Sequence, residues 1–395
     1  MNLAEDIWNL PSPAAYVREI ARVAQAGQHV LAVLPQHIAT KADYSDTLAA
    51  AIGREIGGYS QRVYPTPGQG TLVEALGFNM TNDFDNAPVT VPTLLTHPDS
   101  VGRTFICDIS DLMDDHQSEL LKFLDRLDAE SRSIGSSERS TLVFVVTREF
   151  AREDASSVAL VNRWYWDRVA RWDVAALLAL HGRLQEVGIL GEARLETIIE
   201  IAKWDLELAV ELEQEWNGSE VDLDRRFATR PIRGTSGKPL RRSDDKTPPE
   251  SLVEDWDAGS VDSWHGLPTL NPTVTASHPD TLSRLIWSAQ SRVLLPWIEL
   301  RRTRVEQIVR QKLGVARMTA AINEYTTRYP GVVFDTTLVE VSTLLRIINA
   351  RFGSSEERLR LSTQCLLSAR NRLAHLNPIP HIQLVELAQT CSWLE

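Results

Sequence analysis

Apolar residues form short continuous runs separated by helical patterns in the first part of the chain. The runs lie at residues 29–34, 104–108 and 141–146. A continuous apolar run bounded by polar residues is typical of a strand that is buried on both faces of a parallel sheet. An amphipathic helix is predicted at residues 116–129, between the last two runs. The pattern therefore predicts an α/β domain over residues 1–160.

The middle of the chain changes from helical spacing to linker composition. Residues 174–184 and 192–213 predict two helices. We expect the segment 161–227 that contains them to be a helical lid or a winged-helix-like adaptor. The segment 228–278 begins with Pro, Gly and charged residues, which is typical of a linker. Within it, residues 261–266 predict a short hairpin or an exposed partner-binding turn.

Helical spacing dominates residues 279–395. The predicted helices lie at residues 280–312, 318–326, 337–350, 354–375 and 381–393. Gly353 separates two of them, and Pro378 ends the fourth. The pattern predicts an all-α bundle of four or five helices behind the α/β domain.

Composition narrows the class of protein. The chain has 395 residues, of which 43% are hydrophobic, so it can form two or three cores. Its apolar runs are shorter than the roughly 20 residues that a membrane helix needs. Glu5 and Asp6 precede any apolar run, so the given sequence lacks the basic start of a secretory signal. The cysteines lack metal-site spacing and are three in number. We expect a cytoplasmic protein without a membrane, metal or cofactor.

Charge is unevenly distributed along the chain. The net charge is −12, but residues 279–395 carry fifteen Lys and Arg against ten Asp and Glu, or +5, which leaves −17 for the rest. A basic stretch contains Arg301, Arg302 and Arg304, which are candidates for contacts with nucleic-acid phosphates. A solvated helix face balanced by Glu299 and Glu306 is the alternative.

The end of the predicted helix 354–375 carries the main candidate for catalytic chemistry. It has the sequence Arg370-Asn371-Arg372-Leu373-Ala374-His375. Histidine titrates near neutral pH, so His375 can take or give a proton. A guanidinium remains charged and matches phosphate geometry, so Arg370 can stabilise a charged phosphorane and Arg372 can contact nucleic acid.

Helix geometry allows this constellation without requiring it. Asn371 and His375 are four residues apart and share a helix face, so the amide can orient the imidazole. Arg370 is five residues from His375, about 140° around the helix axis, and reaches the same phosphate only through its long side chain. Capping and surface roles for all three residues remain the alternative.

This segment resembles the Arg-Asn-x-x-x-His signature of HEPN domains, and Ala374-His375 followed by Pro378-Ile379 resembles the abortive-infection branch of that family. The resemblance implies a helical, metal-independent endoribonuclease of a bacterial conflict or anti-phage system. It further implies RNA as the substrate, a homodimer whose Arg and His residues face each other, and operon-encoded protein partners.

The first domain resembles the core of AAA+ and STAND-type P-loop ATPases, because one strand ends in Asp108 and the next in Thr147. The loop that should cradle phosphates has no glycine between Leu34 and Asp43, which argues against such a cradle. Lys41, Asp108 and Asp111 would form a degenerate nucleotide site. We therefore expect an inactive STAND-like module that is not an ATPase.

Three classes of function remain open from the sequence. The first is an RNase effector whose front domain senses or regulates. The second is a non-catalytic adaptor or sensor scaffold of the same kind of system. The third is a DNA-binding regulator with a winged helix at residues 161–227, where the sequence lacks a basic recognition helix.

Overall fold

The computed structural model describes residues 3–64, 70–81, 89–109, 114–152, 159–181, 188–230, 234–241, 246–275, 279–328 and 339–394. The chain divides into two compact units. Unit 1 contains residues 1–180 and 232–274, and unit 2 contains residues 181–231 and 275–395. This division differs from the expected ranges, because the segment 161–227 is shared between the units and the hairpin segment belongs with the sheet.

A five-stranded parallel sheet forms the centre of unit 1. Its order is β2-β3-β4-β1-β5, with β1 in contact with both β4 and β5. The strands are β1 (His29–Leu34), β2 (Ser60–Arg62), β3 (Thr104–Asp108), β4 (Thr141–Thr147) and β5 (Leu160–Trp164). Every residue of β1, β3 and β4 is buried. The apolar runs therefore mark the three inner strands, as predicted.

The two edge strands were not predicted from the sequence. β2 has the sequence Ser-Gln-Arg, and β5 pairs through Leu-Val-Asn-Arg-Trp. Edge strands are partly exposed, so they do not need a continuous apolar run. Their pairing with β3 and β1 is decided by the neighbouring strands rather than by their own composition.

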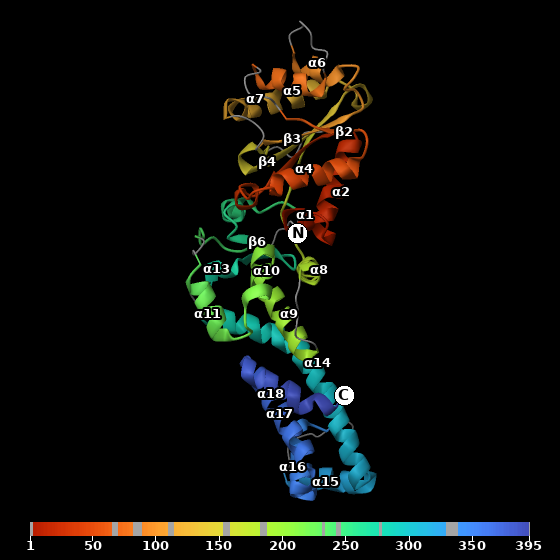
Figure 1. The fold of residues 1–395 in the computed structure, drawn as a ribbon, viewed down its shortest axis with the longest axis vertical. Coiled ribbons are helices and arrows are strands. Elements are labelled where there is room, and N and C mark those ends of the chain that lie inside the picture. Colours follow the sequence, from red (N-terminus) through yellow and green to blue (C-terminus); the bar gives the residue numbers. More distant parts are fainter. Residues whose placement is uncertain are drawn as a thin grey trace. The chain divides into compact units, whose positions relative to one another are not determined.

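Helices cover both faces of the sheet in unit 1 (Figure 1). α2 and α4 lie together on one face, and α5, α6 and α7 lie on the other. The helices of this unit are α1 (Leu3–Ile7), α2 (Pro11–Gln25), α3 (Gln36–Ala39), α4 (Tyr44–Ile56), α5 (Leu72–Met80), α6 (Val91–Thr96), α7 (Asp114–Ser131), α8 (Arg171–His181), α12 (Val253–Asp257) and α13 (Pro272–Thr275).

The predicted hairpin is present in unit 1. β6 (Val261–Trp264) pairs antiparallel with β7 (Leu267–Leu270). The two turn residues, His265 and Gly266, have φ angles of 57° and 71°. Two successive positive φ values are the geometry of a type I′ turn, which matches the twist of the strands it joins.

Unit 2 is helical throughout its described residues (Figure 1). Its helices are α9 (Ile189–Ala202), α10 (Leu206–Glu215), α11 (Glu220–Ala228), α14 (Pro279–Leu313), α15 (Val315–Arg328), α16 (Val341–Arg351), α17 (Glu357–Ala374) and α18 (His381–Cys391). From residue 171 to 230 the described residues form helices and turns but no strand. The described residues of 171–230 therefore show no strand that could form the wing of a winged-helix domain.

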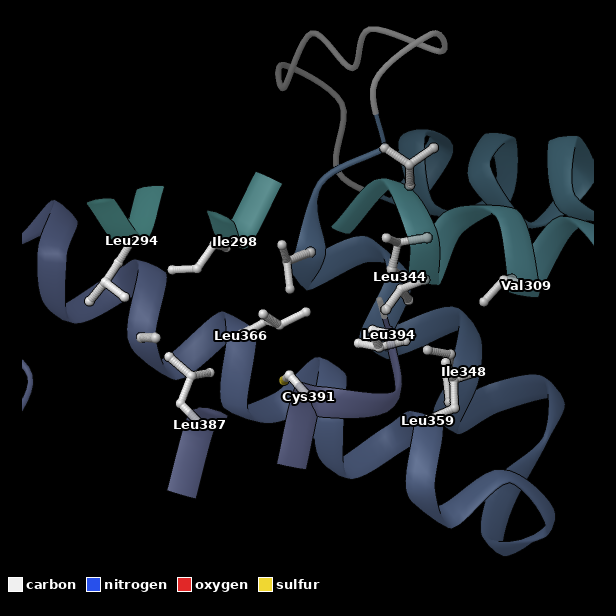
Figure 2. Close-up of a cluster of buried hydrophobic side chains, with 14 of the residues drawn as sticks. Leu294, Ile298, Val309, Leu344, Ile348, Leu359, Leu366, Leu387, Cys391 and Leu394 are labelled. Atoms are coloured by element: carbon white, nitrogen blue, oxygen red, sulfur yellow. The ribbon is translucent and has the colours of Figure 1, made fainter. Parts of the chain in front are cut away.

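One hydrophobic core joins α9 and the helices α14 to α18 of unit 2 (Figure 2). Leu294 and Ile298 of α14 face Leu366 of α17 and Leu387 of α18 across it. Ile189 and Ala193 of α9 belong to the same core, and α9 packs along α14. The helices after residue 279 are thus completed by a helix from the middle of the chain. Of the helices that the structure describes, none is long and apolar enough to cross a membrane.

Candidate functional site

The carboxyl edge of the sheet in unit 1 carries a pocket of about 580 Å³. Its wall combines the segment after β1 with the ends of β3 and β4, and it includes Lys41, Asp108 and Thr147. The carboxyl edge of a parallel sheet is the usual ligand-binding position of α/β folds. The structure therefore brings two of the three residues of the predicted nucleotide site into one pocket. The third, Asp111, lies outside the described residues.

The loop after β1 forms a short helix where a phosphate cradle would be needed. The N–H groups of Ile38, Ala39, Thr40 and Lys41 all donate to carbonyls of the same loop, at 2.9–3.0 Å. The N–H of Gln36 donates to Oδ1 of Asp257 at 2.8 Å. Backbone donors that already bind protein oxygens cannot wrap a phosphate. The loop without glycine therefore has no free backbone N–H group at residues 38–41 to bind a phosphate.

The charge of this pocket is unfavourable for a polyphosphate. Asp43, Asp46, Asp108 and Glu149 line it together with Lys41. Asp46 is neutralised by Arg62, with 2.5 Å between Oδ1 and Nη1. Burial raises the pKa of the neighbouring Asp257, and its hydrogen bond from Gln36 opposes that shift. The described lining is acidic overall, so it repels the anion that a nucleotide would bring.

The second candidate site lies at the carboxyl end of α17 in unit 2. Leu376 has a φ of 60°, and the N–H of Asn377 donates to the Arg372 carbonyl at 3.0 Å. The N–H of Leu376 donates to the Leu373 carbonyl at 3.2 Å. These bonds form a Schellman motif, which satisfies the last carbonyls of a helix. His375 is the capping residue, so it lies where the helix ends.

Arg370, Asn371 and His375 all have exposed side chains. The N–H of His375 donates to the Asn371 carbonyl at 3.1 Å, so the two residues are one helical turn apart. Arg370 lies about 140° away around the same helix. Within the described residues, these three side chains make no hydrogen bond or ion pair, so they are accessible to a ligand.

The Arg372 guanidinium binds a group within the protein. Its Nε and Nη2 donate to the Pro378 carbonyl, at 3.1 and 2.9 Å. Burial is the main cause that raises the pKa of the Glu220 carboxyl. The positive charge of the half-buried Arg372 opposes this rise. Arg372 therefore holds the turn after the helix, and two of its donor nitrogens are occupied there.

The basic stretch of α14 is largely used inside the protein. Arg302 is 6% exposed and donates to Glu299, Glu306 and the Val339 carbonyl at 2.7, 2.8 and 2.9 Å. Its guanidinium is therefore engaged within the protein. Arg301 stacks on Trp297, 4.3 Å from the ring centroid. Arg304 is exposed and bonds Gln307 at 3.3 Å, so it can reach a phosphate.

The compact unit that carries the motif is nearly neutral. Residues 279–395 have a net charge of +5, but residues 181–231 carry twelve Asp and Glu against six Lys and Arg. Because both segments form unit 2, its net charge is −1. Attraction of nucleic acid would thus depend on a few local cations such as Arg370 and Arg304 rather than on the whole unit.

Two residues that hold the motif turn were not predicted from the sequence. Gln290 of α14 donates to the Ile379 carbonyl at 2.9 Å and accepts from the Ile379 N–H at 2.6 Å. Trp287 donates to the Leu373 carbonyl at 2.7 Å. Gln290 interrupts an apolar stripe of spacing four, with Ile286 before it and Leu294 after it. A polar residue in such a stripe is the signal that could have identified it.

Comparison with known proteins adds no assignment to this geometry. Among the described residues, no cluster of three or more His, Cys, Asp or Glu side chains is arranged to hold a metal. No protein-family model matches the chain, and no curated protein matches it either.

Proposed function

We propose that this protein is a metal-independent RNase effector of a bacterial anti-phage or other conflict system, with a regulatory P-loop-like domain that does not hydrolyse nucleotide. One observation carries the proposal. Asn371 and His375 share an exposed face at the end of α17, and with Arg370 they form a group of accessible polar side chains without an internal partner among the described residues.

The chemistry follows from these side chains. The His375 imidazole removes the proton of an RNA 2′-hydroxyl or donates one to the leaving 5′-oxygen. The Asn371 amide orients the ring from one helical turn away. The Arg370 guanidinium stabilises the charge that develops on the phosphorane. A 2′,3′-cyclic phosphate and a 5′-hydroxyl are the products, since the attacking oxygen belongs to the RNA.

A two-fold dimer would improve this arrangement. Arg370 and His375 of one chain lie about 140° apart on the helix, so one chain presents them in different directions. An isologous interface places the same patch of both copies together, so Arg370 of one copy can serve the phosphate held at His375 of the other. The resemblance to HEPN domains supports such a homodimer.

A non-catalytic adaptor or sensor scaffold is the second candidate. The observation that favours it is that Arg302 and Arg372 bind groups within the protein rather than face solvent. Unit 2 is also close to neutral. A binding surface for a protein partner does not need the cations that an RNA backbone requires.

RNA cleavage by the purified full chain, alone and with its operon partners, separates the two candidates. We expect cleavage of RNA but not DNA, in the presence of EDTA, with cyclic phosphate ends detected by mass spectrometry. His375→Ala should lower the rate by about two to four orders of magnitude, and Arg370→Ala by about two to three.

Arg317→Ala is a suitable control for a lost positive charge, because Arg317 is an exposed cation of α15 outside the motif. Sedimentation at micromolar concentration should show a dimer for both His375→Ala and Arg370→Ala. If the double variant His375→Ala, Arg370→Ala cleaves RNA at the wild-type rate, the site is wrong. If the wild type with its partners cleaves no RNA, the adaptor function is favoured.

A further inference from the structure

A groove of about 310 Å³ lies between α17 and α18 in unit 2. Its floor is apolar and includes the buried side chains of Ala369 and Leu387. Its rim is polar and consists of Gln364 and Ser368 from α17 and Gln383 and Glu386 from α18. All four rim side chains are exposed. The groove therefore combines an apolar floor with polar groups around its edge.

The groove continues the face of α17 that carries the candidate catalytic residues. Gln364, Ser368, Asn371 and His375 follow one another at intervals of four, three and four residues. This spacing puts them in one stripe along the helix. At 1.5 Å per residue, Ser368 precedes His375 by about 10 Å along the axis. A chain bound at His375 can thus extend along the groove.

The rim has hydrogen-bonding capacity that the protein does not use. Within the described residues, the side chains of Gln364, Ser368, Gln383 and Glu386 make no hydrogen bond or ion pair. Cys365 lines the groove, and burial is the main cause that raises the pKa of its thiol. The negative charge of Glu386 raises this pKa further, so Glu386 acts on the groove electrostatically. A carboxylate accepts hydrogen bonds only, and an amide side chain both donates and accepts.

We propose that this groove binds one unstacked RNA base next to the scissile phosphate and that it prefers a base with an exocyclic amino group, adenine, cytosine or guanine, over uracil. The inference rests on the proposed RNase function. Single-stranded bases present a flat ring and a polar edge, which match the apolar floor and the amide rim. Glu386 accepts from an exocyclic amino group, whereas it repels the keto oxygens of uracil, which has no amino group.

The charge of Glu386 also favours a base over other occupants. A phosphate in the groove would meet a carboxylate, so the RNA backbone lies outside it and only the base enters. An apolar peptide side chain would leave the amides of Gln364 and Gln383 without partners, which costs free energy when they are desolvated. The ring of a base can pack on the apolar floor of the groove while its polar edge bonds to the rim.

The test uses the full-length protein and single-stranded oligouridine that carries one A, C or G at a fixed position. We expect cleavage near A, C or G to be about tenfold faster than in oligouridine, since one good side-chain pair with a base gives about 1–3 kcal/mol of discrimination. Glu386→Gln should reduce this preference to about threefold or less. Gln389→Ala, an exposed change on the same helix outside the groove, should leave it intact.

A binding measurement makes the two proposals separable. The His375→Ala variant is titrated with 2′-O-methyl oligonucleotides, and the Kd is compared between A-, C-, G- and U-containing forms by fluorescence anisotropy. Cleavage without base preference, or a preference unchanged by Glu386→Gln, overturns the base groove and leaves the RNase function. If no RNA is cleaved, the RNase function fails, and equal Kd values for all four oligonucleotides then overturn the groove too.

Discussion

Leu376 adopts a left-handed backbone conformation, with φ of 60°, at the position where most helices that end in this way use glycine. Its side chain is 63% exposed. An L-residue in this conformation costs about 1–2 kcal/mol because its Cβ approaches the following carbonyl oxygen. The residue directly after the candidate catalytic histidine is therefore held in strain by the bonds of the Schellman motif.

Replacing Leu376 with glycine should stabilise the protein. Leu376→Gly removes the Cβ contact and should raise the free energy of unfolding by about 1 kcal/mol. Urea denaturation followed by circular dichroism measures the shift in midpoint. Leu376→Ala is the matched control, since it shortens an exposed side chain but keeps the Cβ, and it should leave the midpoint nearly unchanged. An equal gain in both variants would show that loss of an exposed apolar side chain is the cause.

Asp262 in β6 provides a pH dependence at the same scale. Its pKa is raised to about 7, mainly by burial and to a smaller extent by the nearby Asp167 carboxylate, and the N–H donors of Ser263 and Asp167 oppose this rise. Between about pH 4 and 7 the folded protein keeps a proton that the unfolded chain has released. The stability contributed by this group is therefore complete below about pH 4 and is lost as the pH rises through about 7.

Asp262→Asn should remove this loss. The Asp262 Oδ1 atom accepts from Ser263 at 2.6 Å and from Asp167 at 3.2 Å, and an amide oxygen can accept both bonds. The variant should match the wild type at pH 4 and be more stable at pH 8, by up to about 4 kcal/mol. Denaturation curves at several pH values measure the difference. A variant equally destabilised at every pH would show that the carboxylate is ionised and needed.

At the scale of elements, the turn between α17 and α18 is fixed from α14. Gln290, which is 5% exposed, occupies both backbone groups of Ile379, and Trp287 binds the Leu373 carbonyl. Buried backbone groups need hydrogen-bond partners. The Gln290 side chain supplies a partner to both the N–H and the C=O of Ile379, as a neighbouring β-strand does in a sheet. The direction in which His375 leaves the helix thus depends on a helix about 85 residues earlier in the chain.

Gln290→Ala should loosen this turn. The variant leaves the N–H and C=O of Ile379 buried without partners, which costs about 1–3 kcal/mol. Hydrogen exchange of residues 375–380 should become at least tenfold faster, and RNA cleavage should fall with it through kcat more than KM. The control is Gln311→Ala, an exposed glutamine of the same helix. Unchanged exchange in Gln290→Ala would show that the turn is held by Arg372 and its own Schellman bonds.

At the scale of the whole molecule, the nucleotide-like pocket and the motif belong to different compact units. The pocket has the position of a nucleotide site but not its donors, because the N–H groups of residues 38–41 bind carbonyls. Its excess of carboxylates opposes a triphosphate. Both features support the proposal that unit 1 does not hydrolyse a nucleotide.

We expect no ATP hydrolysis by the full-length protein. Phosphate release should equal that of Lys41→Ala, with and without Mg²⁺, because neither protein can cradle the phosphates. Turnover clearly above the Lys41→Ala control would contradict the prediction, whereas weak nucleotide binding would not. Arg54→Ala, an exposed cation at the other end of α4, controls for a nonspecific loss of charge.

The sequence by itself determined those elements that have a clear local pattern of apolar residues. The apolar runs of β1, β3 and β4 and the helical spacing after residue 279 predicted the parallel sheet and the helical region. The four-residue spacing of Asn371 and His375 predicted residues one helical turn apart, and the His375 N–H donates to the Asn371 carbonyl at 3.1 Å. Each of these patterns repeats within a few residues, so short-range geometry is enough to specify it.

Only the tertiary structure decided which elements belong together and which cations remain available. The edge strands β2 and β5 exist because β3 and β1 offer them partners, and α9 joins the C-terminal helices through a shared core. Arg302 and Arg372 resemble Arg370 and Arg304 in sequence, but their guanidinium groups meet Glu306 and the Pro378 carbonyl. Burial and hydrogen-bond partners depend on segments distant in the chain, so local sequence does not specify them.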